Sequence, residues 1–167
     1  MQGFGELDEI YRDTILDHYR KPRNTTALEN PEADVQVNNP FCGDEIHLQL
    51  STDGDVLSEV RVSGRGCAIS QSSGSLMSES VVGKSIADVH ELARLFRRLM
   101  TGDGLSEEGE ERLADLLALE GVSRFPVRIK CALLSWSGLS EALSVLKGVR
   151  TTSTSDSGVV TDPNDPQ

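Results

Sequence analysis

Apolar side chains recur at steps of three and four residues near the start of the chain. That spacing places them along one face of an α-helix. Pro22 lacks a backbone N–H and follows the run closely, so the pattern predicts a first helix that ends before it. The apolar positions of this helix are Leu7, Ile10, Tyr11, Ile15, Leu16 and Tyr19.

Three short segments then alternate between apolar and polar residues, which is typical of half-buried strands. The turn residues Asp53-Gly54-Asp55 separate the second segment from the third and predict an antiparallel hairpin. The sequence from Asn38 to Asp44 interrupts the first and second segments and places Cys42 in a turn. The alternating apolar positions are Val35 and Val37, then Ile46, Leu48 and Leu50, then Val60 and Val62.

The second half of the chain has mainly helical patterns. Helix-compatible residues run over about 68–82, and a second amphipathic stretch covers 86–100. Pro126 suits the first turn of a last helix, which extends to about Lys147 and is expected to pack on the sheet. Between these helices, a segment rich in Gly and acidic residues (101–111) leads to a short predicted helix before Gly121. We interpret residues 102–124 as an insert.

Strands followed by helices, without strict alternation, predict an α+β fold with helices packed on one face of a three-stranded antiparallel sheet. A length of 167 residues suits one domain, which we assign to residues 1–150. In residues 151–167 the apolar side chains are Val159 and Val160. Because so few apolar groups cannot offset the entropy of ordering, we expect a disordered C-terminal tail.

The charge and the N-terminal sequence narrow the possible partners. A net charge of −11 repels nucleic acid and anionic membrane surfaces, so neither is an expected partner. Residues 1–6 lack the basic start of a signal peptide, and we expect no membrane span of roughly 18 apolar residues. These features favour a cytoplasmic protein. Cytoplasmic thiols stay reduced, so the three cysteines are interpreted as metal ligands or reactive thiols.

The three cysteines all lie at boundaries between predicted elements. Cys42 is in a strand–strand turn, Cys67 precedes a helix, and Cys131 is in the first turns of the last helix. A lone cysteine is as often a small buried hydrophobe, but three at such positions favour a shared site. Asp44 follows Cys42 across Gly43, so a tight turn can direct a carboxylate and a thiolate to one point. Four such ligands suit zinc, although without a paired C-x-x-C the spacing alone is a weak indication.

Three stretches around these cysteines resemble the motifs of the U-type iron–sulfur cluster assembly family. They occur in the family's order and spacing, and the resemblance covers about residues 7–147. Two differences from the IscU branch make the chain similar to the SufU branch: Lys130 replaces a histidine, and residues 102–124 form an insert. The stretches are Asn39-Pro40-Phe41-Cys42-Gly43-Asp44, Gly64-Arg65-Gly66-Cys67-Ala68-Ile69-Ser70-Gln71 with Ser73, and Arg128-Ile129-Lys130-Cys131.

The resemblance implies a SufE/NifU-like fold, a Zn²⁺ ion held by Cys42, Asp44, Cys67 and Cys131, and a role as a sulfur acceptor. A SufS-type cysteine desulfurase would supply persulfide sulfur to Cys42, with Arg128 in support. Downstream Suf assembly proteins or apo iron–sulfur proteins would receive it. Two alternatives stay open: the same ligands could bind iron and assemble a [2Fe–2S] cluster, or the metal could be purely structural.

Overall fold

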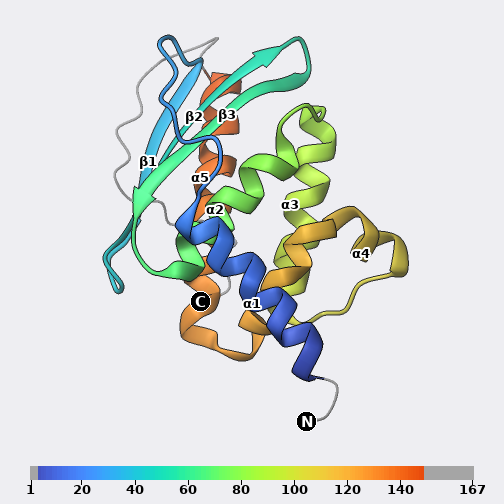
Figure 1. Ribbon diagram of the computed structural model, residues 1–167. Coiled ribbons are helices and arrows are strands. Elements are labelled where there is room, and N and C mark those ends of the chain that lie inside the picture. The colour runs from blue at the N-terminus through green and yellow to red at the C-terminus, as the bar shows by residue number, and fades with distance from the viewer. Residues whose placement is uncertain (1–3, 149–167) are drawn as a thin grey trace.

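The chain forms a three-stranded antiparallel sheet with helices on one of its faces (Figure 1). This confirms the predicted α+β class. The computed structural model describes residues 4–148, and of residues 4–10 only the backbone, so the predicted tail at 151–167 lies outside it. The elements are α1 (Phe4–Arg20), β1 (Ala33–Asn39), β2 (Asp44–Asp53), β3 (Val56–Arg65), α2 (Ala68–Val81), α3 (Ile86–Thr101), α4 (Glu107–Leu113), the 3₁₀ helix η1 (Ala114–Arg124) and α5 (Pro126–Gly148).

The sheet has the order β1-β2-β3, and both connections are antiparallel. Its register pairs Val37 with Ile46 and Leu48 with Val62, so that the apolar side chains share one buried face. The predicted hairpin between β2 and β3 is confirmed, and Gly54 adopts the positive φ of 64° that its tight turn requires. The strands therefore follow the alternation that the sequence predicts.

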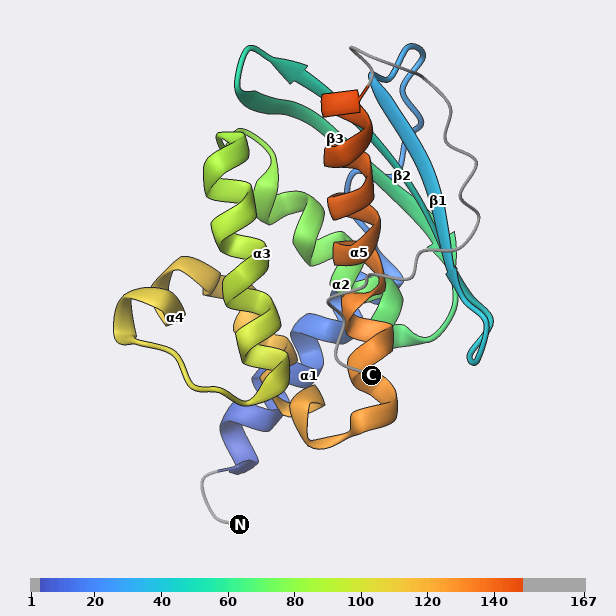
Figure 2. The same ribbon diagram turned by 180° about the vertical axis from the view of Figure 1, so that it is seen from behind.

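Helices α2 and α5 lie directly on the apolar face of the sheet, as Figure 2 shows from behind. The close approach depends on two glycines. A Cβ at Gly74 would lie 3.0 Å from Val62 Cγ1, and a Cβ at Gly138 would lie 3.2 Å from Val37 Cγ2. The predicted packing of the last helix on the sheet is confirmed.

Helix α5 is long and apolar. Its 23 residues include an 18-residue window with a mean hydropathy of 1.2, enough by length and composition to cross a membrane. However, 56% of that window is buried inside the fold, as expected of a core helix. A helix enclosed by other elements carries the same apolar composition as a membrane span.

The segment after α3 contains a helix that the sequence did not predict. Helix α4 begins at Glu107, within the stretch 101–111 that is rich in Gly and acidic residues, and the predicted short helix before Gly121 is the 3₁₀ helix η1. The Ser106 hydroxyl accepts a hydrogen bond from Gly109 N–H at 3.1 Å and caps α4. Leu116 and Leu119 of η1 are fully buried against the other helices, so this segment contributes to the core.

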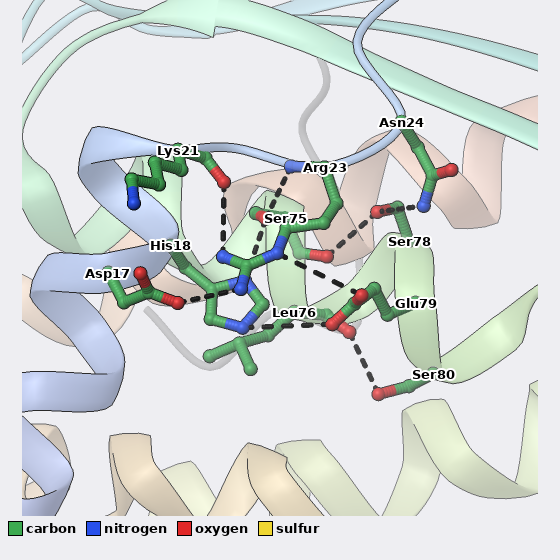
Figure 3. Close-up of polar contacts among 10 residues, drawn as sticks. All are labelled: Asp17, His18, Lys21, Arg23, Asn24, Ser75, Leu76, Ser78, Glu79 and Ser80. Carbon is green, nitrogen blue, oxygen red and sulfur yellow. Dashed lines mark hydrogen bonds and ion pairs between the residues drawn. The ribbon is translucent and has the colours of Figure 1, made fainter.

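A polar cluster joins the end of α1 to α2 (Figure 3). His18 is 5% exposed, and its Nδ1 lies 2.7 Å from Ser75 Oγ. The same hydroxyl oxygen accepts a hydrogen bond from Arg23 N–H at 2.9 Å. On the other side of the ring, His18 Nε2 faces Glu79 at 3.7 Å.

This arrangement predicts that His18 makes the fold sensitive to acid. Burial, and then the positive charge of Arg23, lower the pKa of His18 below its ordinary value of 6.5. Between that lowered pKa and about 6.5 the unfolded chain binds more protons, so stability decreases as the pH falls through this window. We expect His18→Gln to reduce the slope by up to about 1.4 kcal/mol per pH unit in urea unfolding experiments.

The exposed His90 provides a matched control, because His90→Gln should leave the slope unchanged. An unaltered slope in His18→Gln would contradict the assignment of the buried, neutral ring.

Candidate metal centre

Three segments far apart in sequence meet at one end of the molecule: the β1–β2 turn, the start of α2 and the start of α5 (Figures 1 and 2). They carry Cys42, Cys67 and Cys131, and Asp44 is the first residue of β2. Cys67 is the N-cap residue of α2, as the sequence predicts. The structure thus brings together the four side chains that were chosen from the sequence.

The distances between these side chains are those of a compact cluster. Cys42 Sγ lies 3.6 Å from Cys131 Sγ, and Cys67 Sγ lies 3.8 Å from Asp44 Oδ2. Donor atoms of Cys42, Asp44 and Cys131 all lie within 4.8 Å of one another. Cys67 joins this group through its contact with the carboxylate.

The donor set fits a tetrahedral zinc ion. With Zn–S bonds of about 2.3 Å and Zn–O bonds of about 2.0 Å, tetrahedral geometry separates two sulfurs by about 3.8 Å, and a sulfur from an oxygen by about 3.5 Å. The Cys42–Cys131 distance of 3.6 Å and the Cys67–Asp44 distance of 3.8 Å agree with those separations to a few tenths of an ångström. Cys67 is not among the donors that all lie within 4.8 Å of one another, so its sulfur must move closer to complete a tetrahedron. Three sulfur donors also disfavour magnesium and calcium, which prefer oxygen.

Asp44 is fixed by the segment that carries Cys67. Cys67 N–H donates to Asp44 Oδ1 at 2.9 Å, which leaves Oδ2 directed toward the sulfur. The carboxylate is only 1% exposed. A Cβ on Gly66 would lie 2.2 Å from Asp44 Oδ1, and Gly66 has a φ of 151°. The absence of a side chain at Gly66 is therefore what makes room for the carboxylate.

The three thiols differ in exposure. All are free, with Cys42 exposed, Cys67 intermediate and Cys131 fully buried. Burial is the main cause that raises the pKa of Cys131, followed by its hydrogen bond with Cys42 and the negative charge of Cys67. Because the buried thiol holds its proton strongly, binding of a metal at this sulfur must displace that proton. Cys42 is the thiol that solvent and partners can reach.

Arg128 lies beside the cluster on the first turn of α5. Its pKa is raised, chiefly because its guanidinium hydrogen-bonds the Cys131 side chain, and further by attraction to the Cys67 thiolate. The structure therefore places this predicted supporting residue next to the sulfurs. Being exposed, it faces solvent as well as the site.

Three exposed apolar side chains, here called the apolar rim, lie on the two segments that carry Cys42 and Cys131. Phe41 is 86% exposed, Val127 is 72% exposed and Phe125 is 59% exposed. Lys130 Nζ lies 5.7 Å from the centre of the Phe41 ring, a cation–π contact.

Sequence reasoning missed the residues that shape the centre without being candidate ligands. Gly66 and Asn39 were named only as members of the resemblance motifs, although both lie against site residues. Ser70 Oγ lies 3.9 Å from Cys67 Sγ. A signal was present for Asn39, because Asn before Pro is a common turn start. No pattern in the sequence could show that Gly66 faces Asp44.

Comparison with known proteins identifies the family to which this chain belongs. The model of the NifU-like N-terminal domain matches residues 10–132. A Bacillus subtilis protein named zinc-dependent sulfurtransferase SufU is 41% identical over 142 residues, which cover 85% of this chain and 95% of that protein. A Streptococcus pyogenes protein named iron–sulfur cluster assembly scaffold protein IscU is 39% identical, with 84% of this chain and 87% of the relative covered.

Solved structures share the fold. One from Fervidobacterium islandicum AW-1, described as a putative iron–sulfur cluster assembly scaffold protein for the SUF system, has a TM-score of 0.75 at 32% identity. It matches 81% of this chain and 97% of its own length. The N-terminal part of a NifU-like protein from Brucella abortus has the same TM-score at 23% identity and covers 84% of this chain and 96% of its own. At that identity it supports the fold alone.

Proposed function

Because the chain belongs to the NifU-like N-terminal domain family, we propose that it is a zinc-dependent sulfur acceptor in iron–sulfur cluster assembly. Its sulfur donor is the persulfide of a SufS-type cysteine desulfurase. The observation that carries this proposal is the cluster of Cys42, Asp44 and Cys131 donor atoms, with the Cys67 sulfur in contact with the Asp44 carboxylate. Similarity to a relative named zinc-dependent sulfurtransferase supports it.

Cys42, Asp44, Cys67 and Cys131 would hold the zinc ion. When bound, zinc keeps its sulfur ligands in the thiolate form at neutral pH. Arg128 offsets part of the negative charge that three thiolates and a carboxylate bring together, because its guanidinium lies beside Cys131 and Cys67.

Cys42 is the acceptor in this proposal. Its thiolate attacks the terminal sulfur of the donor persulfide, so that a new S–S bond forms on Cys42 while the donor cysteine leaves as a thiolate. Cys42 then carries the persulfide, and no oxidant or reductant is needed. Cys67 and Cys131 belong to helix starts, whereas Cys42 lies on an exposed turn, where its movement disturbs the core least.

The rim formed by Phe41, Phe125 and Val127 suits the docking of the desulfurase around Cys42. Apolar contacts there would exclude water from the reacting sulfurs, and Lys130 adds positive charge next to them. Sulfur would pass from Cys42 to downstream Suf proteins or apo iron–sulfur proteins.

A scaffold for a [2Fe–2S] cluster is the second candidate function. Mixed cysteine and aspartate ligands permit it, and a relative at 39% identity is named as a scaffold. Iron and sulfide would then be cargo on the same four residues.

Metal content and desulfurase kinetics test the proposal together. We expect freshly purified protein to contain about one zinc per chain, and to raise the turnover of a SufS-type desulfurase. Removal of zinc by a chelator should abolish that stimulation, and added zinc should restore it. Stimulation by metal-free protein would contradict zinc dependence. Anaerobic incubation with iron and sulfide that displaces zinc and yields a transferable cluster would instead favour the scaffold.

A further inference from the structure

Asn39 is the last residue of β1 and lies directly before the turn that carries Cys42. It is opposite Asp44 in the strand register and is only 7% exposed. Its backbone carbonyl accepts hydrogen bonds from Cys42 N–H at 3.2 Å and Gly43 N–H at 2.8 Å. The backbone carbonyl of Asn39 therefore holds the β1–β2 turn closed.

The side chain of Asn39 makes two further contacts, and each uses a different end of the amide. Oδ1 accepts a hydrogen bond from Phe41 N–H at 3.0 Å. Nδ2 donates to Cys42 Sγ at 3.5 Å, within the range of an N–H···S hydrogen bond. Because the Phe41 N–H requires an acceptor, it fixes the orientation of the amide and presents the N–H₂ group to the sulfur.

A fixed, neutral donor is chemically suited to this position. An N–H donor stabilises negative charge on sulfur, and its geometry favours one direction of the Sγ atom. Aspartate has nearly the same shape and keeps the acceptor for Phe41, but it offers no donor and adds a like charge beside the thiolate. Only an amide supplies both contacts without that repulsion.

We propose that Asn39 is a positioning residue for sulfur transfer, whose side-chain N–H holds the Cys42 thiolate in the direction of attack. The inference rests on the proposed function. Asn39 donates a hydrogen bond to the reacting sulfur throughout the step and transfers no proton. The residue therefore acts through Cys42 and affects the rate of transfer, whereas docking of the sulfur donor depends on other surfaces.

The test uses zinc-loaded Asn39→Asp and follows the added sulfur on Cys42 by mass spectrometry during a single turnover with a SufS-type desulfurase and cysteine. We expect persulfide formation to slow by about tenfold or more, with KM for the desulfurase within about twofold of wild type. Zinc content and the unfolding midpoint should stay close to wild type, since the acceptor for Phe41 N–H remains. A purely structural role predicts no change in the rate.

Asn38→Asp is the matched control, because it introduces the same charge one residue earlier in β1 and should transfer sulfur at the wild-type rate. If Asn39→Asp loses zinc, Asn39→Ser replaces it under the same criteria, since its neutral hydroxyl can accept from Phe41 N–H but is too short to reach the sulfur. Wild-type transfer in the zinc-loaded variant would overturn the inference. Cys42→Ala separates the two claims: if it still accepts sulfur, the proposed function fails as well.

Discussion

Replacing Cys42 with alanine is expected to abolish sulfur acceptance, with persulfide formation on the protein lowered by at least about 100-fold. The nucleophilic sulfur is removed, while Asp44, Cys67 and Cys131 remain in place. Loss of an exposed side chain from a turn should change the free energy of unfolding of the metal-free protein little. Mass spectrometry after incubation with the desulfurase and cysteine measures the loss, and zinc analysis shows how much metal three ligands retain.

Cys131→Ala provides the contrast, because this thiol is fully buried. It should lower the metal affinity and also disturb packing at the start of α5. Persulfide formation at the wild-type rate in Cys42→Ala would contradict the assignment of the acceptor. If all cysteine variants lost folding and activity in parallel, the metal would have a purely structural role.

Gly66→Ala is expected to damage the metal centre although it removes none of the four proposed ligands. The new Cβ would lie 2.2 Å from Asp44 Oδ1 and 2.9 Å from Ser70 Oγ. The buried carboxylate must then leave its hydrogen bond with Cys67 N–H. Loss of a hydrogen bond that orients a metal ligand typically costs about 10–100-fold in metal affinity. Competition with a chromophoric zinc chelator measures the change.

Gly54→Ala controls for backbone strain in this experiment. Gly54 also has a positive φ, of 64°, but a Cβ there would meet nothing within 4 Å. Alanine at position 54 should therefore cost stability of about 1 kcal/mol and leave zinc binding unchanged. Equal zinc affinities in Gly66→Ala and wild type would show that the site does not require the carboxylate in its observed position.

The sequence predicted the elements best where a pattern repeats over many residues. The alternating valines and leucines of the sheet and the long helical stripes are examples, because burial of one face imposes a fixed period. Helix α4 was missed since its residues, Glu107–Leu113, are mostly charged. Its formation depends on the Ser106 cap and on acidic side chains near the positive end of the helix dipole. Such local effects produce no periodic pattern of apolar residues, so the sequence does not indicate the helix.

The four proposed ligands could be chosen from the sequence because each cysteine lies where an element starts or ends. Elements of a small α+β fold meet at such boundaries, so convergence was a reasonable expectation. The supporting contacts could not be predicted in the same way. Asp44 is the first residue of the β2–β3 hairpin and Gly66 follows its last residue, so the two are far apart in sequence. Only the strand register brings them together. Asn39, in contrast, contacts residues of its own turn, and its position before a proline indicates that turn in the sequence.

The wide separation of Cys42 and Cys131 along the chain, 89 residues, has a consequence for biosynthesis. While the ribosome is still making the polypeptide, the first thiol and its neighbouring carboxylate emerge long before the last sulfur donor. A nascent chain accordingly lacks a full coordination sphere until the start of α5 has left the ribosome. High-affinity capture of an ion would then report that translation has passed this helix and that its start has docked.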